Sequence, residues 1–326
     1  MTRIALVVNP VGVDDAEALQ ALLRERCEQS GWDAPLILET TAEDPGAGMA
    51  RQALDAGVER VLVAGGDGTV RTVAEELLGS GVALGILPAG TGNLLARNLD
   101  LPLDLAQALE LALSGPTRTI DAGQVADGAA FVVMAGMGLD AAMMQEAPDA
   151  LKAKIGWPAY LVGGVRGLRR GRFRVEISLD GGPALRRRVS TVVVGNVGTL
   201  QGGLALLPEA RPDDGLLDVC VVAPDTPLQW AAVLTRLLTH RPPRPHDRRL
   251  DRWRAADVSV RAAHPQARQV DGDPIDDGSR LDLSVRASGL VVVAPHPDAS
   301  HDDASHDEEN PVAVDASVTA SAGGRA

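Results

Sequence analysis

Two hydrophobic patterns alternate along the first third of the chain. Short continuous apolar runs, which are typical of strands buried on both faces, alternate with longer segments whose apolar residues have helical spacing. The predicted strands are residues 3–10, 34–40, 59–66 and 82–90, and the predicted helices are residues 15–31, 44–57 and 69–81. Strands that alternate with helices favour a parallel sheet covered on both faces. We therefore predict an N-terminal α/β domain.

The pattern changes near residue 120. Short apolar runs now recur between Gly, Pro and Asp, a spacing that predicts an antiparallel β-rich sandwich. Helical spacing interrupts it at 150–170 and 226–240, and the basic run at 241–254 is expected to be a loop. The apolar run 289–295 predicts either a last strand or a segment that returns to the first domain.

These patterns predict the domain organisation. The α/β domain is expected at residues 1–121, with 288–295 as a segment that could complete it, and the β-sandwich domain at 122–287. Residues 296–326 are predicted to form a disordered acidic tail, because Ala, Ser, His and Asp bury little surface. Ligands of such α/β sheets bind beyond the carboxyl ends of the strands, so we expect the active site in the cleft between the domains.

Three loops follow strands at that edge of the predicted sheet: Asn9-Pro10, GGDGT (65–69) and PAGTGN (88–93). Glycine lets backbone N–H groups approach an anion without obstruction, and the helix that follows adds its positive end. These loops therefore predict a phosphate-binding site.

The GGDGT loop contains a carboxylate and no lysine. Asp67 cannot contact phosphate directly without repulsion. It could hold Mg²⁺, which would bridge the carboxylate to phosphate, or it could accept a proton from an attacking hydroxyl. The structural alternative is that Asp67 caps the following helix.

Several motifs occur in a characteristic order. VVNP (7–10), GGDGTV (65–70) and ILPAGTGNLLARNL (86–99) are followed by FVVMAGMGLDAAMM (131–144) and QVDGDPI (269–275). In this order they resemble the diacylglycerol kinase catalytic-domain family, closest to its soluble bacterial lipid kinases, and further from the related sphingosine and ceramide kinases. The resemblance extends from about residue 3 to residue 294.

The resemblance implies ATP-dependent, Mg²⁺-assisted phosphorylation of a lipid hydroxyl, such as that of diacylglycerol. The residues expected at the nucleotide are Asn9, Thr40, Gly65, Gly66, Asp67, Gly68, Thr69, Gly90, Thr91, Gly92 and Asn93. In DGDP (271–274), Asp271 and Asp273 match the family's catalytic acids, and Asp273 corresponds to the general base, which is usually Glu. In PDDGLLD (212–218), a structural Mg²⁺ site of the bacterial members matches Asp213, the carbonyl of Leu216 and Asp218.

The chemistry agrees with this assignment. Phosphoryl transfer requires positioning, neutralised phosphate charge and a residue that orients the nucleophile. The alternative for DGDP is a plain hairpin turn, and the alternative for PDDGLLD is a turn before a strand. Two departures from the family pattern stand out. Asp273 is one methylene shorter than Glu, so Asp271 could be the base instead, and the first loop has acids at Asp14 and Asp15.

Charge and composition limit the partners. The net charge is -13, and residues 295–326 hold seven acids and one Arg, so nucleic-acid binding gets no support. Cys27 and Cys220 give no disulfide framework, which fits a reducing cytoplasm. We find neither a signal peptide nor an apolar stretch of ~18 residues.

Arginine and lysine crowd residues 152–174, which also contain Trp157 and Tyr160, and arginines recur at 186–188. They form either a solvated face or a surface attracted to an anionic membrane. We therefore predict a cytoplasmic enzyme that visits the membrane surface transiently, and exposed strand edges in the second domain would suit a homodimer.

Two other functions fit parts of the sequence. An NAD kinase-like enzyme shares the GGDGT loop, but the Asn-Glu or Asn-Asp pair expected for its ribose pocket is not found. A non-catalytic regulator that binds lipid or nucleotide would explain Asp at 273 and the altered first loop. A dinucleotide fingerprint at GMGLDAA (136–142) is rejected, because the required strand–helix unit is not evident.

Overall fold

The computed structural model describes residues 2–138, 172–200, 204–238 and 249–296. Residues Met1–Pro295 form one compact unit. The helix predicted at 150–170, most of the basic segment 152–174 and nearly all of the predicted acidic tail lie outside the described residues.

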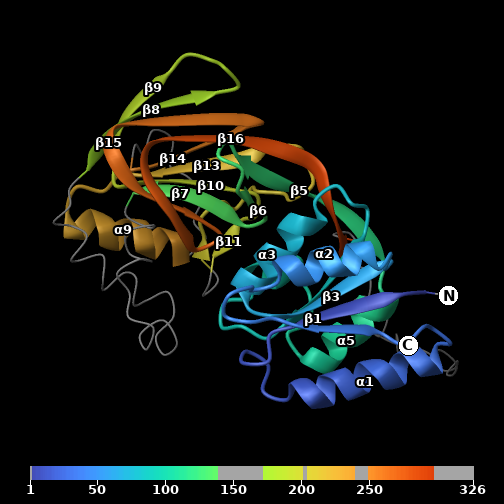
Figure 1. Cartoon of the computed structure of the whole chain (residues 1–326). Helices are drawn as coiled ribbons and strands as arrows, with labels where there is room; N and C mark the ends of the chain where they lie inside the picture. Colours follow the sequence, from blue (N-terminus) through green and yellow to red (C-terminus); the bar gives the residue numbers. More distant parts are fainter. Residues whose placement is uncertain (1, 139–171, 201–203, 239–248, 297–326) are drawn as a thin grey trace, which may run out of the picture. The chain divides into compact units, whose positions relative to one another are not determined.

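The first domain is a parallel sheet between two layers of helices (Figure 1). Its strands pair in the order β4-β3-β1-β2. They are β1 (Ile4–Val8), β2 (Leu36–Glu39), β3 (Arg60–Gly65) and β4 (Ala83–Pro88). The helices are α1 (Ala16–Gln29), α2 (Ala47–Asp55), α3 (Asp67–Leu77), α4 (Leu94–Asn98) and α5 (Leu105–Ser114). The α/β domain predicted from the sequence is confirmed.

Alternation along the strands produces the two layers. In β3, Val61 and Val63 pack with α2 and α3, whereas Leu62 and Ala64 pack with α1 and α5. Since successive side chains of a strand point to opposite faces, a continuous apolar run can only be buried between two covers.

The helices of this domain begin in two ways. Asp15 and Asp104 cap α1 and α5, because their side chains accept hydrogen bonds from the N–H groups of Ala18 (2.9 Å) and Gln107 (3.0 Å). Helix α3 instead follows Gly66, which has no side chain that could cap it. The N-cap residue of α3 therefore supplies no acceptor of the kind that Asp15 and Asp104 give to α1 and α5.

The second domain is an antiparallel sheet in the order β14-β13-β10-β7-β15-β16, with β8 and β9 extending it beyond β15. Its strands are β5 (Thr117–Val125), β6 (Ala130–Phe131), β7 (Met134–Gly138), β8 (Phe173–Leu179), β9 (Leu185–Val189), β10 (Thr191–Gly195), β11 (Thr199–Leu200), β12 (Leu204–Ala205), β13 (Leu217–Val222), β14 (Leu250–Ala255), β15 (Asp257–Val270) and β16 (Asp273–Val293). One face covers a core of Val and Leu, and the other packs against α9 (Pro227–Leu238), which confirms the helix predicted at 226–240.

Part of the predicted loop at 241–254 is a strand, so that prediction was wrong for β14. This strand pairs antiparallel with β13, and its end residues Leu250 and Ala255 are buried. Its polar residues have tertiary partners: Arg252 donates to the carbonyl of Leu206 (2.8 Å), and Trp253 lies 5.6 Å from the guanidinium of Arg187. A run rich in arginine looks exposed from the sequence, and tertiary contacts such as these accommodate it in the sheet.

Strand β16 joins the two sheets. Its first half pairs with β15 and its second half with β5, and Val291 and Val292 also pair in parallel with β4. The strand bends at Ser288, whose φ is 49° and whose N–H donates to Asp121 (2.7 Å). The run 289–295 is therefore both the end of a strand and a return to the first sheet, while the exact domain boundaries stay a prediction.

Candidate active site

The predicted nucleotide residues of the first domain lie at one edge of the parallel sheet. Asn9, Thr40, Gly65 and Gly90 stand at or just after the carboxyl ends of β1, β2, β3 and β4. The register brings these ends together, because Val8 pairs with both Glu39 and Ala64, and Gly65 pairs with Pro88. The Asn9 side chain accepts from the N–H groups of Val11 (3.1 Å) and Gly12 (3.3 Å), which closes the first loop.

The turns at 65–69 and 90–93 touch through their backbones. A Cβ added to Gly90 would lie 2.6 Å from the Cα of Gly66, so no side chain fits there. Asn93, with a φ of 49°, fixes the second turn: its side chain accepts from the N–H of Gly90 (2.9 Å) and donates to the Gly90 carbonyl (2.8 Å). Thr69 is buried, and Thr91 is exposed within the second turn.

Asp67 links the two turns. It is the first residue of α3, yet its Oδ1 accepts from the N–H of Leu94 (2.6 Å), at the start of α4. The expected structural alternative, a cap for its own helix, is therefore not what Asp67 does. A Cβ on Gly92 would lie 2.4 Å from its Oδ2. Burial raises the pKa of Asp67, and the N–H donors oppose that rise.

The DGDP motif forms a tight hairpin turn between β15 and β16. Val270 pairs with Asp273, and the two turn residues Asp271 and Gly272 have φ values of 47° and 95°. Both values are positive, as in the two-residue turns that join antiparallel strands. The hairpin alternative is thus correct as local geometry, and the turn also determines where its two acids point.

Asp271 points into the protein. Its carboxylate accepts from the N–H groups of Val132 (2.9 Å), Val133 (3.0 Å) and Met134 (2.7 Å). Burial raises the pKa of Asp271 to about 6, against the effect of these three donors. Because both oxygens are occupied and the residue is 8% exposed, Asp271 is poorly placed to meet a substrate hydroxyl.

Asp273 points toward the first domain. A Cβ on Gly68 would lie 4.0 Å from its Oδ2, which puts this carboxylate beside the GGDGT turn. Arg71, on the first turns of α3, binds the same oxygen at 2.7 Å. Arg71 was not among the predicted site residues, although its position four residues after Asp67 on the predicted helix would place it near that loop.

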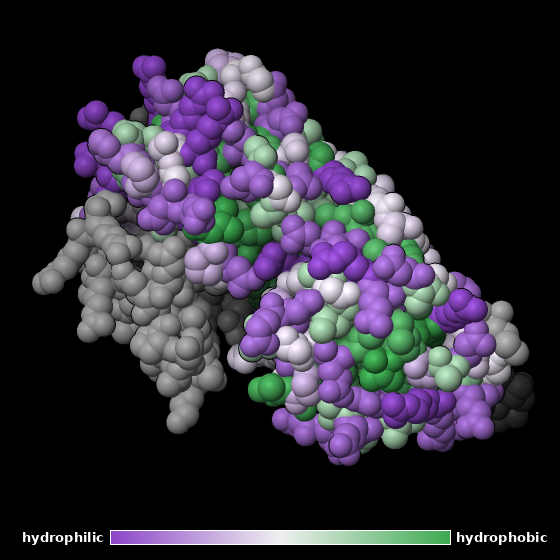
Figure 2. Space-filling view, in the orientation of Figure 1, coloured by the Kyte–Doolittle hydropathy of each residue, from purple (hydrophilic) through white to green (hydrophobic). Residues whose placement is uncertain are grey.

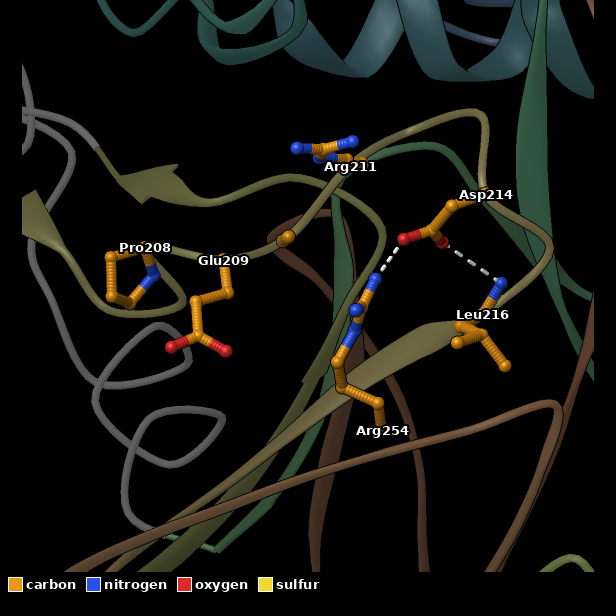
Figure 3. A pocket seen from close by; sticks show the side chains of 7 residues that line it. Pro208, Glu209, Arg211, Asp214, Leu216 and Arg254 are labelled. Carbon is orange, nitrogen blue, oxygen red and sulfur yellow. Dashed lines mark hydrogen bonds and ion pairs between the residues drawn. The ribbon is translucent and has the colours of Figure 1, made fainter.

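The predicted structural Mg²⁺ ligands lie in and around a different turn. Asp213 pairs with Arg118 (3.7 Å), and Asp218 lies 3.6 Å from Arg254, which also pairs with Asp214. Figure 3 shows the pocket beside them, of about 690 Å³, with Arg254 turned toward Asp214 and Leu216 at its wall.

Asp218 is the residue of this group that best fits a cation. Its Oδ2 is buried and makes no hydrogen bond within the described part of the chain. Burial, and then Glu209, raise the pKa of Asp218 to about 6. Asp213 is directed to Arg118 instead. Among the described residues no three His, Cys, Asp or Glu side chains gather as they would around a metal ion.

Comparison with known proteins decides the family. Residues 3–125 match the diacylglycerol kinase catalytic domain, and residues 132–292 match the YegS C-terminal NAD kinase beta sandwich-like domain. A "Probable lipid kinase YegS-like" of Pseudomonas aeruginosa PAO1 is 34% identical over 301 residues, which cover 90% of this chain and 94% of that protein. The chain belongs to the diacylglycerol kinase catalytic-domain family.

Two more similarities agree with membership of the diacylglycerol kinase family. A "Probable lipid kinase YegS-like" of Klebsiella pneumoniae (strain 342) is 40% identical over 173 residues, 51% of this chain and 57% of that protein. The crystal structure of a diacylglycerol kinase from Bacillus anthracis Sterne superposes with a TM-score of 0.71 at 22% identity, over 90% of this chain and 97% of that one. This second similarity shows the fold alone.

The fold class predicted from the hydrophobic pattern is confirmed. The family predicted from the motifs is also confirmed, and with it the enzyme class, an ATP-dependent lipid kinase. Cys27 and Cys220 are buried, free thiols. No helix within the described ranges has the length and apolar character needed to cross a membrane.

Proposed function

We propose that this lipid kinase transfers the γ-phosphoryl group of Mg-ATP to a hydroxyl group of a lipid, with Asp273 as the general base. The observation that supports it best is the approach of Asp273 to Gly68, since an acid of the second domain thereby meets the glycine turn of the first. In-line phosphoryl transfer requires the base and the phosphate site to lie next to each other, so that both substrates can be bound there together.

The glycine turns are the proposed phosphate site. Backbone N–H groups at the uncapped start of α3, together with Asn9, Thr40 and the turn at 90–93, would contact the nucleotide. Gly66 and Gly90 support this role, because a Cβ on Gly90 would force the two turns apart. Asp67 would hold the catalytic Mg²⁺, since carboxylate oxygen is a preferred ligand of that ion. When bound, Mg²⁺ neutralises phosphate charge and orients the transferred group.

In the proposed reaction, Asp273 accepts the proton of the lipid hydroxyl as its oxygen bonds to the γ-phosphorus. The bond between that phosphorus and the bridging oxygen breaks, and ADP leaves with the electron pair. A positioned base contributes about 10²–10⁴-fold to such a step. Asp271 would not be the base; by binding the N–H groups of residues 132–134 it would hold the hairpin turn in place.

A structural cation near residues 213–218 remains part of the proposal, with Asp218 as its best-supported ligand. Its buried Oδ2 has no hydrogen-bond donor within the described ranges, since Arg254 lies 3.6 Å away, and a metal cation in direct contact would satisfy it. Metal analysis of the purified protein, compared with Asp218→Asn, tests this. Equal metal content in both proteins would contradict it.

An enzyme with a lipid substrate must bind the membrane surface. We propose that arginines of β8 and β9 assist this binding. Arg174, Arg186 and Arg188 are exposed, and the register sets Arg174 directly opposite Arg188, an unfavourable pair unless an anion covers it. Figure 2 shows hydrophilic residues gathered over this hairpin. Anionic vesicles should bind the protein more tightly than zwitterionic ones, and Arg174→Gln with Arg188→Gln should reduce the difference.

We also propose a cytoplasmic location, which suits ATP use and the two free thiols of Cys27 and Cys220. We also propose a homodimer through exposed sheet edges, which light scattering tests. Strands β14 and β9 end the sheet of the second domain among the described strands.

The deciding experiment incubates purified protein with labelled ATP and a total lipid extract, then identifies the labelled product. Diacylglycerol and NAD are offered side by side, because the second domain matches a sandwich named after NAD kinase. We expect labelled lipid, no labelled NADP, and loss of labelling in Asp67→Asn. Labelling of NAD alone would favour the NAD kinase alternative, and no ATP turnover with any lipid would favour the non-catalytic regulator.

A further inference from the structure

Arg71 forms the direct contact between α3 and the proposed base. Its Nε and Nη2 both donate to Oδ2 of Asp273, at 3.1 and 2.7 Å. The two residues are 202 positions apart in the sequence, and only tertiary structure brings them together. The Arg71 side chain is 19% exposed, whereas that of Asp273 is 51% exposed. The arginine is therefore the better-ordered partner by burial.

Arg71 is itself held from the other side. Its Nη1 donates to Oε2 of Glu75 (3.4 Å), one helical turn further along α3. The other oxygen of Glu75 accepts from the N–H of Ala130 (3.0 Å), at the start of β6. The chain of contacts Ala130–Glu75–Arg71–Asp273 thus begins and ends in the second domain and passes through the helix that starts at the GGDGT turn.

We propose that Arg71 is the positioning residue for Asp273. This inference rests on the proposed function, in which Asp273 is the general base. Aspartate is a short side chain on an exposed hairpin, and a misplacement of about 1 Å can cost about 10²-fold in rate. A guanidinium that donates twice to one oxygen restricts the carboxylate rotation. Both donations go to Oδ2, the oxygen that lies beside Gly68, so Oδ1 of the same carboxylate is left to receive the hydroxyl proton.

Glu75 also affects the charge balance around Arg71 and Asp273. One guanidinium lies between two carboxylates, so the cluster has an excess negative charge before the reaction. When Asp273 takes the hydroxyl proton and becomes neutral, Arg71 stays paired with Glu75. The protonated base therefore leaves the half-buried Arg71 with a partner, and a charge held away from water without a partner is costly in proteins.

The kinetic test compares Arg71→Gln, Arg71→Lys and Asp273→Asn in the full chain. The matched control is Arg51→Gln, because Arg51 on α2 also forms an ion pair with α3, through Glu76, away from the site. We expect Arg71→Gln to lower kcat about 10- to 100-fold with the KM for ATP within about threefold of wild type. Arg71→Lys should recover part of the loss, and Arg51→Gln should leave kcat unchanged.

The double variant provides a sharper test. If Arg71 acts through Asp273, then Asp273→Asn lowers kcat far less in the Arg71→Gln background than in wild type. Effects that simply multiply would overturn the proposal, and so would an Arg71→Gln enzyme with kcat within about twofold of wild type. Wild-type protein that phosphorylates no lipid would overturn the proposed function itself.

A spectroscopic readout needs no substrate. The Nε–H signal of Arg71, assigned by its loss in Arg71→Gln, should be protected from exchange because it donates to Asp273. The signal should shift in Asp273→Asn and stay unchanged in Arg51→Gln. If the Nε–H signal of Arg71 is unchanged in Asp273→Asn, the two side chains do not pair in solution. That result would contradict the inference whatever the kinase assay shows.

Discussion

The glycine turns of the first domain and the hairpin turn of the second reach the same site by opposite means. The turns at 65–69 and 90–93 approach each other because side chains are missing, down to a Gly66–Gly90 backbone contact. The hairpin at 270–273 is held by a side chain, since Asp271 binds three backbone N–H groups. In the glycine turns, the absence of side chains leaves backbone N–H groups open to an anion. In the hairpin, the Asp271 carboxylate is used to hold the turn, and Asp273 beside it stays exposed.

The same contrast separates the three acids of the site. Asp67 is half-buried and Asp271 is buried; both accept backbone N–H groups, and both have raised pKa values because burial disfavours their charge. Asp273 is half exposed and pairs with Arg71. Two acids therefore organise turns, and the third remains available to a hydroxyl. The comparison teaches that proximity in the sequence, as in Asp271-Gly272-Asp273, says nothing about shared roles.

The largest expected effect concerns Asp273. Asp273→Asn should lower kcat for lipid phosphorylation about 10²–10⁴-fold, because the amide cannot accept the hydroxyl proton. The melting temperature should stay close to wild type, since the side chain is half exposed. Asp276→Asn and Asp277→Asn, exposed acids of the same strand, are the controls and should keep full kcat. An active Asp273→Asn enzyme would remove the distinction between the two acids of the hairpin.

The next effect concerns the contact between the glycine turns. Gly90→Ala should weaken ATP binding by at least about tenfold, because its Cβ would stand 2.6 Å from Gly66 and push the turns apart. Isothermal titration with ATP measures this. Gly57→Ala is the control: with a φ of 67° and open space around it, it should cost about 1–2 kcal/mol of stability and leave ATP affinity unchanged. Equal affinities for all three proteins would mean that the turns do not hold the nucleotide.

A smaller effect concerns Asp271. Asp271→Asn should lower the free energy of unfolding by about 1–3 kcal/mol, because an amide nitrogen would replace an oxygen that accepts buried N–H groups. Urea unfolding measures the loss, and Asp273→Asn should not share it. If the two variants unfold alike, Asp271 does not organise the turn.

The smallest effect is the pH dependence of the same residue. Its pKa is raised to about 6 in the folded protein, so the folded state binds the proton before the unfolded chain does. Asp271 therefore contributes stability at low pH that is lost as pH rises through about 6. When the pH is lowered from about 7.5 to about 5.5, protonation of Asp271 should raise the free energy of unfolding of the wild-type protein by on the order of 1 kcal/mol. Urea unfolding at both pH values should show the gain in wild type relative to Asp271→Asn; an identical pH slope would refute it.

Much of the fold could be predicted from the sequence because its signals are local. The apolar runs and helical spacing of the first domain predicted β1 to β4 and α1 to α3 within a few residues of their observed ends. Strand β14 was missed, since Arg252 and Trp253 look exposed until their partners Leu206 and Arg187 are known. Likewise, the sequence left open whether 289–295 was a strand or a returning segment, and the bend at Ser288 makes it both.

By itself, the sequence determined the family, the two kinds of domain and the glycine turns, because these depend on ordered motifs and short-range patterns. Tertiary structure alone decided which acid is exposed at the site. Asp271 and Asp273 are equal in the sequence, and they differ only because the main chain at 132–134 binds one and Arg71, 202 residues away, binds the other. Such partners lie far apart along the chain, so no local pattern of side chains can encode which one each carboxylate meets.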